Sequence, residues 1–178
     1  MQKERIETIF KWNFYLSIVF IMALSALNHF LYELLPVGVI AVFAPVSESI
    51  AEHLKIVFYP ILLWWCLTFV FFKKSKGLLP SKWFSGAFTS AFLSICLLTT
   101  LCSTLFFALG ATKDSLVLHI LIEVVTIFVS QWTGYHVYKY SKGRVGVLVA
   151  LGVISAVSAI LMAAFTFGVP NAPLFFAP

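Results

Sequence analysis

The chain has 178 residues, of which 61% are hydrophobic and 11% charged, and its formal net charge is +5. A water-soluble domain of this size could not bury so much apolar surface, so the composition predicts a membrane protein. The positive charge does not indicate nucleic-acid binding, because the basic residues lie in short clusters between long apolar runs. Runs of this length are typical of helices rather than barrel strands, which predicts an all-α integral membrane fold.

Five apolar runs are long enough to cross a bilayer, since about 20 apolar residues span its hydrocarbon core. We therefore predict a five-transmembrane-helix bundle that forms a single membrane domain, residues 1–178. The first run has no small-residue cleavage site at its end, which favours a membrane span over a signal peptide. The expected spans cover about residues 12–32, 48–72, 83–109, 116–138 and 145–168.

The start of the second span carries the clearest helix signals. Residues 34–44 are expected to form a loop. Ser47 follows Pro45 and is a good N-cap, and Glu48 would then lie in the first turn, where a negative charge suits the helix dipole. The second span is therefore expected to begin at about Glu48 and to run to Phe72.

Basic residues, glycine and proline separate the later spans. Lys73–Lys82 and Lys139–Arg144 are basic loops, and Gly110 ends the third span. Pro170 and Pro173 end the fifth span, before a short apolar tail.

The distribution of lysine and arginine predicts the orientation. Both residue types cluster before the first span, between the second and third, and between the fourth and fifth. The other loops and the tail carry only Lys113. Because cytoplasmic loops are enriched in these residues, we expect a cell-membrane protein with its N-terminus inside and its C-terminus outside.

A layer of ionisable residues is predicted near the outer edge of the membrane. With a rise of about 1.5 Å per residue, its members lie about 24–37 Å from the basic ends of their spans. Glu123 is the deepest and needs a partner, because an unpaired carboxylate in the membrane costs about 2–3 kcal/mol. The layer comprises His29, Glu33, Glu48, Glu52, His53, Lys55, His119 and Glu123.

Three pairs within this layer are four positions apart: His29 with Glu33, Glu48 with Glu52, and His119 with Glu123. Residues four apart share one helix face, where imidazole and carboxylate groups can bind the same ion. Such mixed ligands favour Zn²⁺, iron or manganese. We predict as metal ligands Glu52, His53, His119 and Glu123. We predict a further ligand-binding role for His29, Glu33, Glu48 and Lys55.

Simpler interpretations stay open for the same residues. Glu33 and Glu48 would also suit solvated helix ends, where charge costs little. Lys55 could extend its ammonium group to the interface or form a structural salt bridge with Glu52. The three cysteines lack the spacing of a metal motif and are expected to be small buried hydrophobic residues: Cys66, Cys96 and Cys102.

The segment 45–55, PVSESIAEHLK, resembles a motif of an uncharacterised family of small bacterial multi-pass membrane proteins. That motif reads Pro-Val-Asn-Glu-Ser-x-x-Glu-His-Leu-Lys, and the ending at residues 170–178 is also similar to the family's. The chain departs from the motif at Ser47, which stands in place of Asn, and at Ala51, where Trp is common. The resemblance implies the membrane architecture and the importance of the motif, but no activity.

Three hypotheses for the polar layer follow. In the first, it is a pocket for a cation or a small polar ligand in a transporter or transporter subunit. In the second, it is the site of an intramembrane metal-assisted hydrolase with Glu52 or Glu123 as base, although the motifs His-Glu-x-x-His, Gly-x-Ser-x-Gly and Ser-x-x-Lys do not occur. In the third, it only fixes helix packing in a scaffold. The expected partners are the lipid bilayer, a second copy of the chain or transporter subunits, and no nucleic acid.

Overall fold

The computed structural model describes residues 2–73, 78–111, 115–168 and 175, and for residues 2–12 the backbone alone. This part of the chain is helical, without strands. Five stretches are long and apolar enough to cross a membrane, which confirms the predicted number of spans. They are Asn13–Leu34, Ile50–Phe72, Pro80–Ala108, Leu116–Tyr140 and Val145–Phe167.

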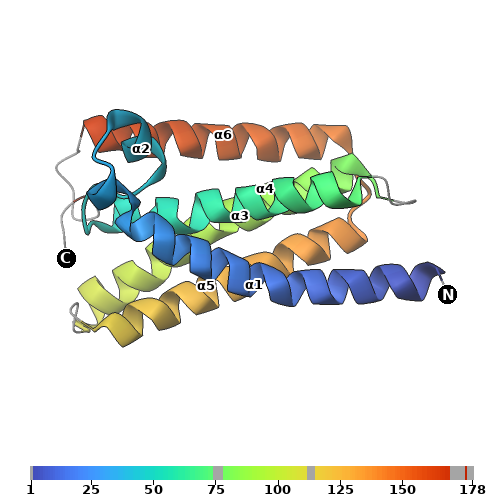
Figure 1. Cartoon of the computed structure of the whole chain (residues 1–178), viewed down its shortest axis with the longest axis horizontal. Helices are drawn as coiled ribbons and strands as arrows, with labels where there is room; N and C mark the ends of the chain where they lie inside the picture. Colours follow the sequence, from blue (N-terminus) through green and yellow to red (C-terminus); the bar gives the residue numbers. More distant parts are fainter. Residues whose placement is uncertain (1, 74–77, 112–114, 169–174, 176–178) are drawn as a thin grey trace.

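The helices form one bundle in which α1 begins at one end and α6 finishes at the other (Figure 1). α4 packs against α3, α5 and α6, while α1 packs against α3 and α5. The elements are α1 (Gln2–Leu34), α2 (Gly38–Phe43), α3 (Ile50–Phe72), α4 (Pro80–Cys102), the π-helix η1 (Ser103–Ala108), α5 (Leu116–Tyr140) and α6 (Val145–Phe167).

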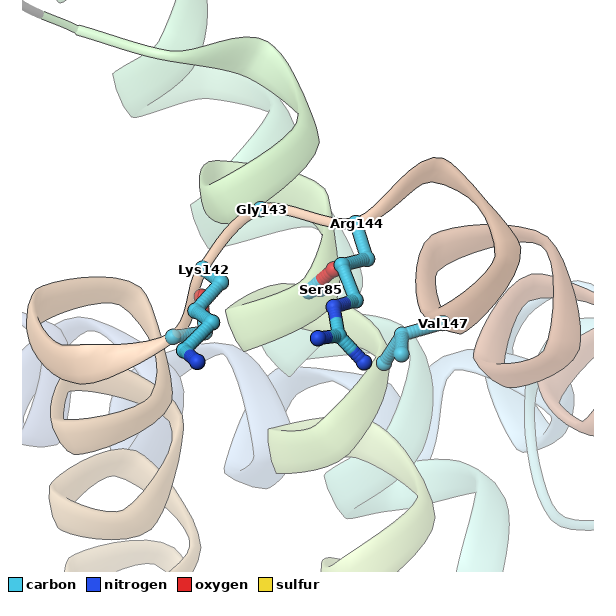
Figure 2. Close-up of a pocket in the computed structure, with 6 residues that line it drawn as sticks. Ser85, Lys142, Gly143, Arg144 and Val147 are labelled. Carbon is cyan, nitrogen blue, oxygen red and sulfur yellow. The ribbon is translucent and has the colours of Figure 1, made fainter.

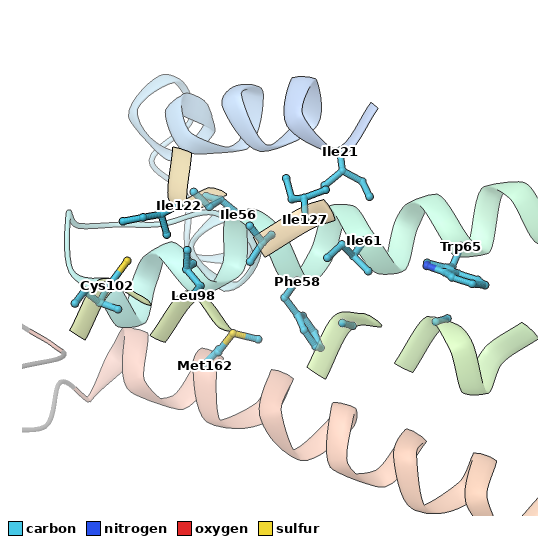
Figure 3. Close-up of a cluster of buried hydrophobic side chains, with 14 of the residues drawn as sticks. Ile21, Ile56, Phe58, Ile61, Trp65, Leu98, Cys102, Ile122, Ile127 and Met162 are labelled. Atoms are coloured by element: carbon cyan, nitrogen blue, oxygen red, sulfur yellow. The ribbon is translucent and has the colours of Figure 1, made fainter. Parts of the chain in front are cut away.

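Aromatic and branched aliphatic side chains fill the centre of the bundle (Figure 3). Trp65 and Trp83 are fully buried, and the Trp83 indole donates a hydrogen bond of 2.9 Å to the Trp65 carbonyl. Beside Trp65, α4 and α5 approach so closely that a Cβ on Gly86 would lie 2.6 Å from the Gly134 carbonyl oxygen. Only glycine at both positions permits this contact.

Two predictions about the second span are wrong. The helix begins at Ile50 rather than Glu48, and its N-cap is Ser49 rather than Ser47. The Ser49 hydroxyl accepts a hydrogen bond from the Glu52 amide, which leaves Glu48 before the helix. Glu48 and Glu52 therefore do not share a helix face.

Other boundaries also differ from the predictions. The expected loop at residues 34–44 contains α2, which packs against α6. The third span begins earlier, at Pro80, and its last turns widen into η1. The fourth span extends to Tyr140. Lys113, Pro170 and Pro173 lie outside the described residues.

Candidate metal centre

A cavity of about 290 Å³ opens at the end of the bundle where α1 ends and α3 and α5 begin. α1 and α5 each contribute two of its polar side chains, the segment before α3 contributes Glu48, and the first turn of α3 contributes His53. Five predicted site residues therefore come together, although they lie far apart in the sequence. The polar lining comprises Ser25, His29, Glu48, His53, His119 and Glu123.

His29, Glu48 and His53 form the tightest group in this lining. The Glu48 carboxylate has one oxygen 3.7 Å from His29 Nε2 and the other 3.4 Å from His53 Nε2. One ligand atom from each residue lies within 4.8 Å of the other two. Ligands bound to Zn²⁺ at about 2.1 Å in a tetrahedron are about 3.4 Å apart, so small side-chain shifts would place all three on one ion.

The backbone fixes the tautomer of His53. His53 Nδ1 lies 2.9 Å from the Ser49 carbonyl oxygen, which can only accept a hydrogen bond. Nδ1 therefore carries the proton, and in the neutral ring Nε2 has a free lone pair directed toward Glu48. Proteins usually orient a metal-binding histidine in this way, with a hydrogen bond from the ring nitrogen that does not bind the metal.

The three side chains of this group, His29, Glu48 and His53, which we call the triad, differ in their exposure to solvent. The Glu48 side chain is 66% exposed, that of His29 28% and that of His53 18%. His29 Nδ1 is buried and has no hydrogen-bond partner among the described residues. An ion could therefore reach the carboxylate from outside and be held between the imidazoles.

His119 and Glu123 line the same cavity on α5. The His119 ring lies 6.4 Å from the His53 ring, centroid to centroid, and 5.0 Å from that of Phe106 in η1. Oε1 of Glu123 is buried and lacks a hydrogen-bond partner in the part of the chain that the structure describes. The predicted face shared by these two residues thus points into the cavity, beyond the triad.

Glu52 and Lys55 form a separate cluster outside the cavity lining. The Lys55 ammonium lies 2.7 Å from Glu52 Oε2 and donates a 2.7 Å hydrogen bond to the Ala41 carbonyl in α2. The Thr166 hydroxyl of α6 bonds both side chains. Glu52 and Lys55 thus form the structural salt bridge that was one of the open interpretations. Their charged groups bind each other and not the cavity.

Glu33 is also separate from the cavity and is exposed at the end of α1. Cys102 lines the cavity and is buried, whereas Cys66 and Cys96 are exposed on the bundle surface, contrary to the expectation that all three are buried. Ser25 and Thr166 were not predicted, because isolated hydroxyl residues in apolar runs carry no sequence signal of their partners.

The family of unknown function DUF6512 matches residues 1–177. The chain belongs to this family. The match confirms the resemblance to an uncharacterised family that the sequence suggested. No curated protein and no solved structure matches the chain. The DUF6512 description names no chemical activity.

Proposed function

We propose that this DUF6512 protein binds a divalent transition-metal ion through His29, Glu48 and His53. Two imidazoles and one carboxylate are a ligand set that suits Zn²⁺, Fe²⁺ or Mn²⁺ and leaves coordination positions for water or an exchanging ligand. The observation that carries the proposal is the convergence of three ligand atoms from α1, the segment before α3, and α3 itself.

We further propose that the cavity moves or hands on the ion. His119 and Glu123 offer an imidazole and a carboxylate beyond the triad, and Glu123 is one of the few charged residues within the spans. Ionisable residues inside a membrane bundle typically mark ion pathways. The protein would then be a metal transporter or the metal-capturing subunit of one.

The orientation belongs to the same proposal. Among the described residues, Lys82, Lys139, Lys142 and Arg144 lie at the end opposite the cavity, so by the positive-inside rule the metal centre would face the outside of a cell membrane. A bacterial source and a family-wide role for the 45–55 motif are part of this proposal as well. That motif would matter for two reasons, because it supplies Glu48 and His53 to the centre and Glu52 and Lys55 to the neighbouring salt bridge.

The proposal is tested by titrating the detergent-purified protein with Zn²⁺ in competition with a chromogenic chelator. His29→Ala, His53→Ala and Glu48→Gln should each weaken binding by about tenfold or more, since each removes a ligand. Glu33→Gln and His136→Ala are matched controls, because Glu33 is exposed outside the cavity and His136 stacks on Tyr140 at the other end of α5. Equal zinc affinity in the wild type and all three ligand variants would refute the metal centre.

A further inference from the structure

A second cavity, of about 260 Å³, lies at the opposite end of the bundle. It is formed where the turn between α5 and α6 meets the first turns of α4. Figure 2 shows the side chains of Lys142 and Arg144 extending in the same direction on either side of Ser85. The lining comprises Ser85, Ser141, Lys142, Gly143, Arg144 and Val147.

The backbone of the turn holds the two basic residues in place. Gly143 has a φ of +64°, in the left-handed region that favours glycine. A Cβ at this position would lie 3.0 Å from both Ser81 Oγ and Lys82 Cγ of α4. The turn therefore rests directly against α4, and the residues that flank Gly143 are set on the two sides of the cavity.

The cavity carries a positive charge that no acidic side chain among the described residues pairs with. The sequence contains no acidic residue after Glu123. The four acidic side chains that the structure describes are Glu33, Glu48, Glu52 and Glu123, and they lie toward the metal-centre end of the bundle. Within the described residues, no ion pair involves Lys142 or Arg144. The positive charges of Lys142 and Arg144 in one cavity favour the binding of an anion there.

Neutral hydrogen-bond donors complete the lining. Ser141 Oγ is buried and has no hydrogen-bond partner among the residues described. α6 begins at the cavity with Arg144 as its N-cap and no side-chain cap, and the Val147 amide donates to the Arg144 carbonyl, so among the described residues the free amides of the first turn are those that precede Val147. A helix N-terminus with adjacent arginine and lysine is a favourable environment for phosphate oxygens.

We propose that this cavity binds a phosphate group, carried either by an anionic lipid headgroup or by a free phosphate compound. Arg144 would donate hydrogen bonds to two phosphate oxygens, Lys142 would neutralise the charge of the phosphate, and the Ser141 hydroxyl would donate a further hydrogen bond. The cavity lies where two membrane spans end, which is the depth of the headgroups. The proposal is independent of the metal centre at the other end.

The experiment is native mass spectrometry of the full-length protein in detergent with phosphatidic acid, phosphatidylglycerol or phosphatidylcholine. The Lys142→Gln/Arg144→Gln variant should bind anionic lipid about tenfold more weakly than the wild type, because it loses two charged hydrogen-bond donors. Lys73→Gln/Lys139→Gln is the matched control, since it removes the same charge from the same end but leaves the lining intact. The control should bind within about twofold of the wild type. Single substitutions of Lys142 and Arg144 should each weaken binding by a smaller factor.

A parallel titration with inorganic phosphate distinguishes the two sources of the phosphate group. One outcome is that millimolar phosphate displaces the lipid from the wild type but not from the Lys142→Gln/Arg144→Gln variant. This result would assign the site to the phosphate group alone. Selective binding of lipid without such displacement would assign it to a headgroup. Equal losses in the two double variants, or equal binding of phosphatidylcholine, would overturn the proposal, because diffuse surface charge or the acyl chains would then explain the binding.

Discussion

The Lys55 ammonium lies 2.7 Å from the Glu52 carboxylate, and both side chains are buried between α2, α3 and α6. The same ammonium also bonds the Ala41 carbonyl, and the carboxylate accepts a hydrogen bond from the Val46 amide. These bonds hold the segment that precedes α3 in place. That segment carries Glu48, so the buried pair positions one ligand of the proposed metal centre.

Removing one partner of this pair should destabilise the protein strongly. Lys55→Met leaves the Glu52 carboxylate buried without its cation and should lower the free energy of unfolding by about 3–5 kcal/mol. The Lys55→Met/Glu52→Gln double variant should recover part of that loss, because no unpaired charge remains. Thermal unfolding in detergent measures both. A double variant no more stable than Lys55→Met would contradict the account of a buried ion pair.

The contact between α4 and α5 should tolerate no side chain at either glycine. Gly134→Ala would place its Cβ 2.8 Å from the Gly86 carbonyl oxygen and 2.8 Å from Ser90 Cβ, which forces the helices apart. We expect a loss of about 3 kcal/mol, at the upper end of overpacking costs, with a lower yield of folded protein. Gly146→Ala is the control, since its Cβ would meet nothing within 4 Å. A Gly134→Ala protein with the same unfolding temperature as the wild type would show that the helices do not touch there.

The two candidate caps of α3 make different predictions. Ser49→Ala removes the oxygen that accepts from the Glu52 amide and should cost about 0.5–2 kcal/mol. Ser47 does not cap the helix and, among the described residues, its hydroxyl bonds Ser49 alone, so Ser47→Ala should cost less. Chemical denaturation of the two variants compares them directly. A larger effect at Ser47 would restore the cap that the sequence suggested.

Gln131 is fully buried, and neither its amide nitrogen nor its oxygen has a hydrogen-bond partner in the described part of the chain. Gln131→Met keeps the volume and removes the unpaired amide, so it should raise the free energy of unfolding by about 1–3 kcal/mol. Gln131→Ala should instead lower it, because it leaves a cavity. Differential scanning fluorimetry separates these outcomes. Destabilisation by Gln131→Met would mean that the amide is bonded in the membrane, for instance to water.

The sequence was sufficient to predict the number of spans and a common level for several polar residues along the bundle, but not the direction of each side chain. Apolar run length determines the spans, and helical rise determines depth, which brought His29, His53 and His119 to one level. Direction depends on how each helix turns within the bundle. His53 and Lys55 are two positions apart, so they face different sides, one toward the cavity and the other toward α2 and α6.

Which residues form the proposed metal centre depends on the residue at which α3 begins, and the sequence pattern did not distinguish the two possible starts. Ser47 and Ser49 are both good N-caps, and a shift of two residues decides whether Glu48 is inside the helix or before it. Because the helix begins at Ile50, Glu48 lies between His29 and His53 instead of beside Glu52. Glu52 is then free to pair with Lys55.

Zinc K-edge X-ray absorption on the zinc-loaded, detergent-purified protein tests the metal centre most directly. We predict one zinc per chain with only nitrogen and oxygen neighbours at about 2.0–2.2 Å and the scattering signature of two imidazoles. In His29→Ala the signature should fall to one imidazole, while His136→Ala should match the wild type. A protein that retains no zinc, or a spectrum unchanged in the His29→Ala/His53→Ala variant, would contradict the assignment of His29, Glu48 and His53 as a metal centre.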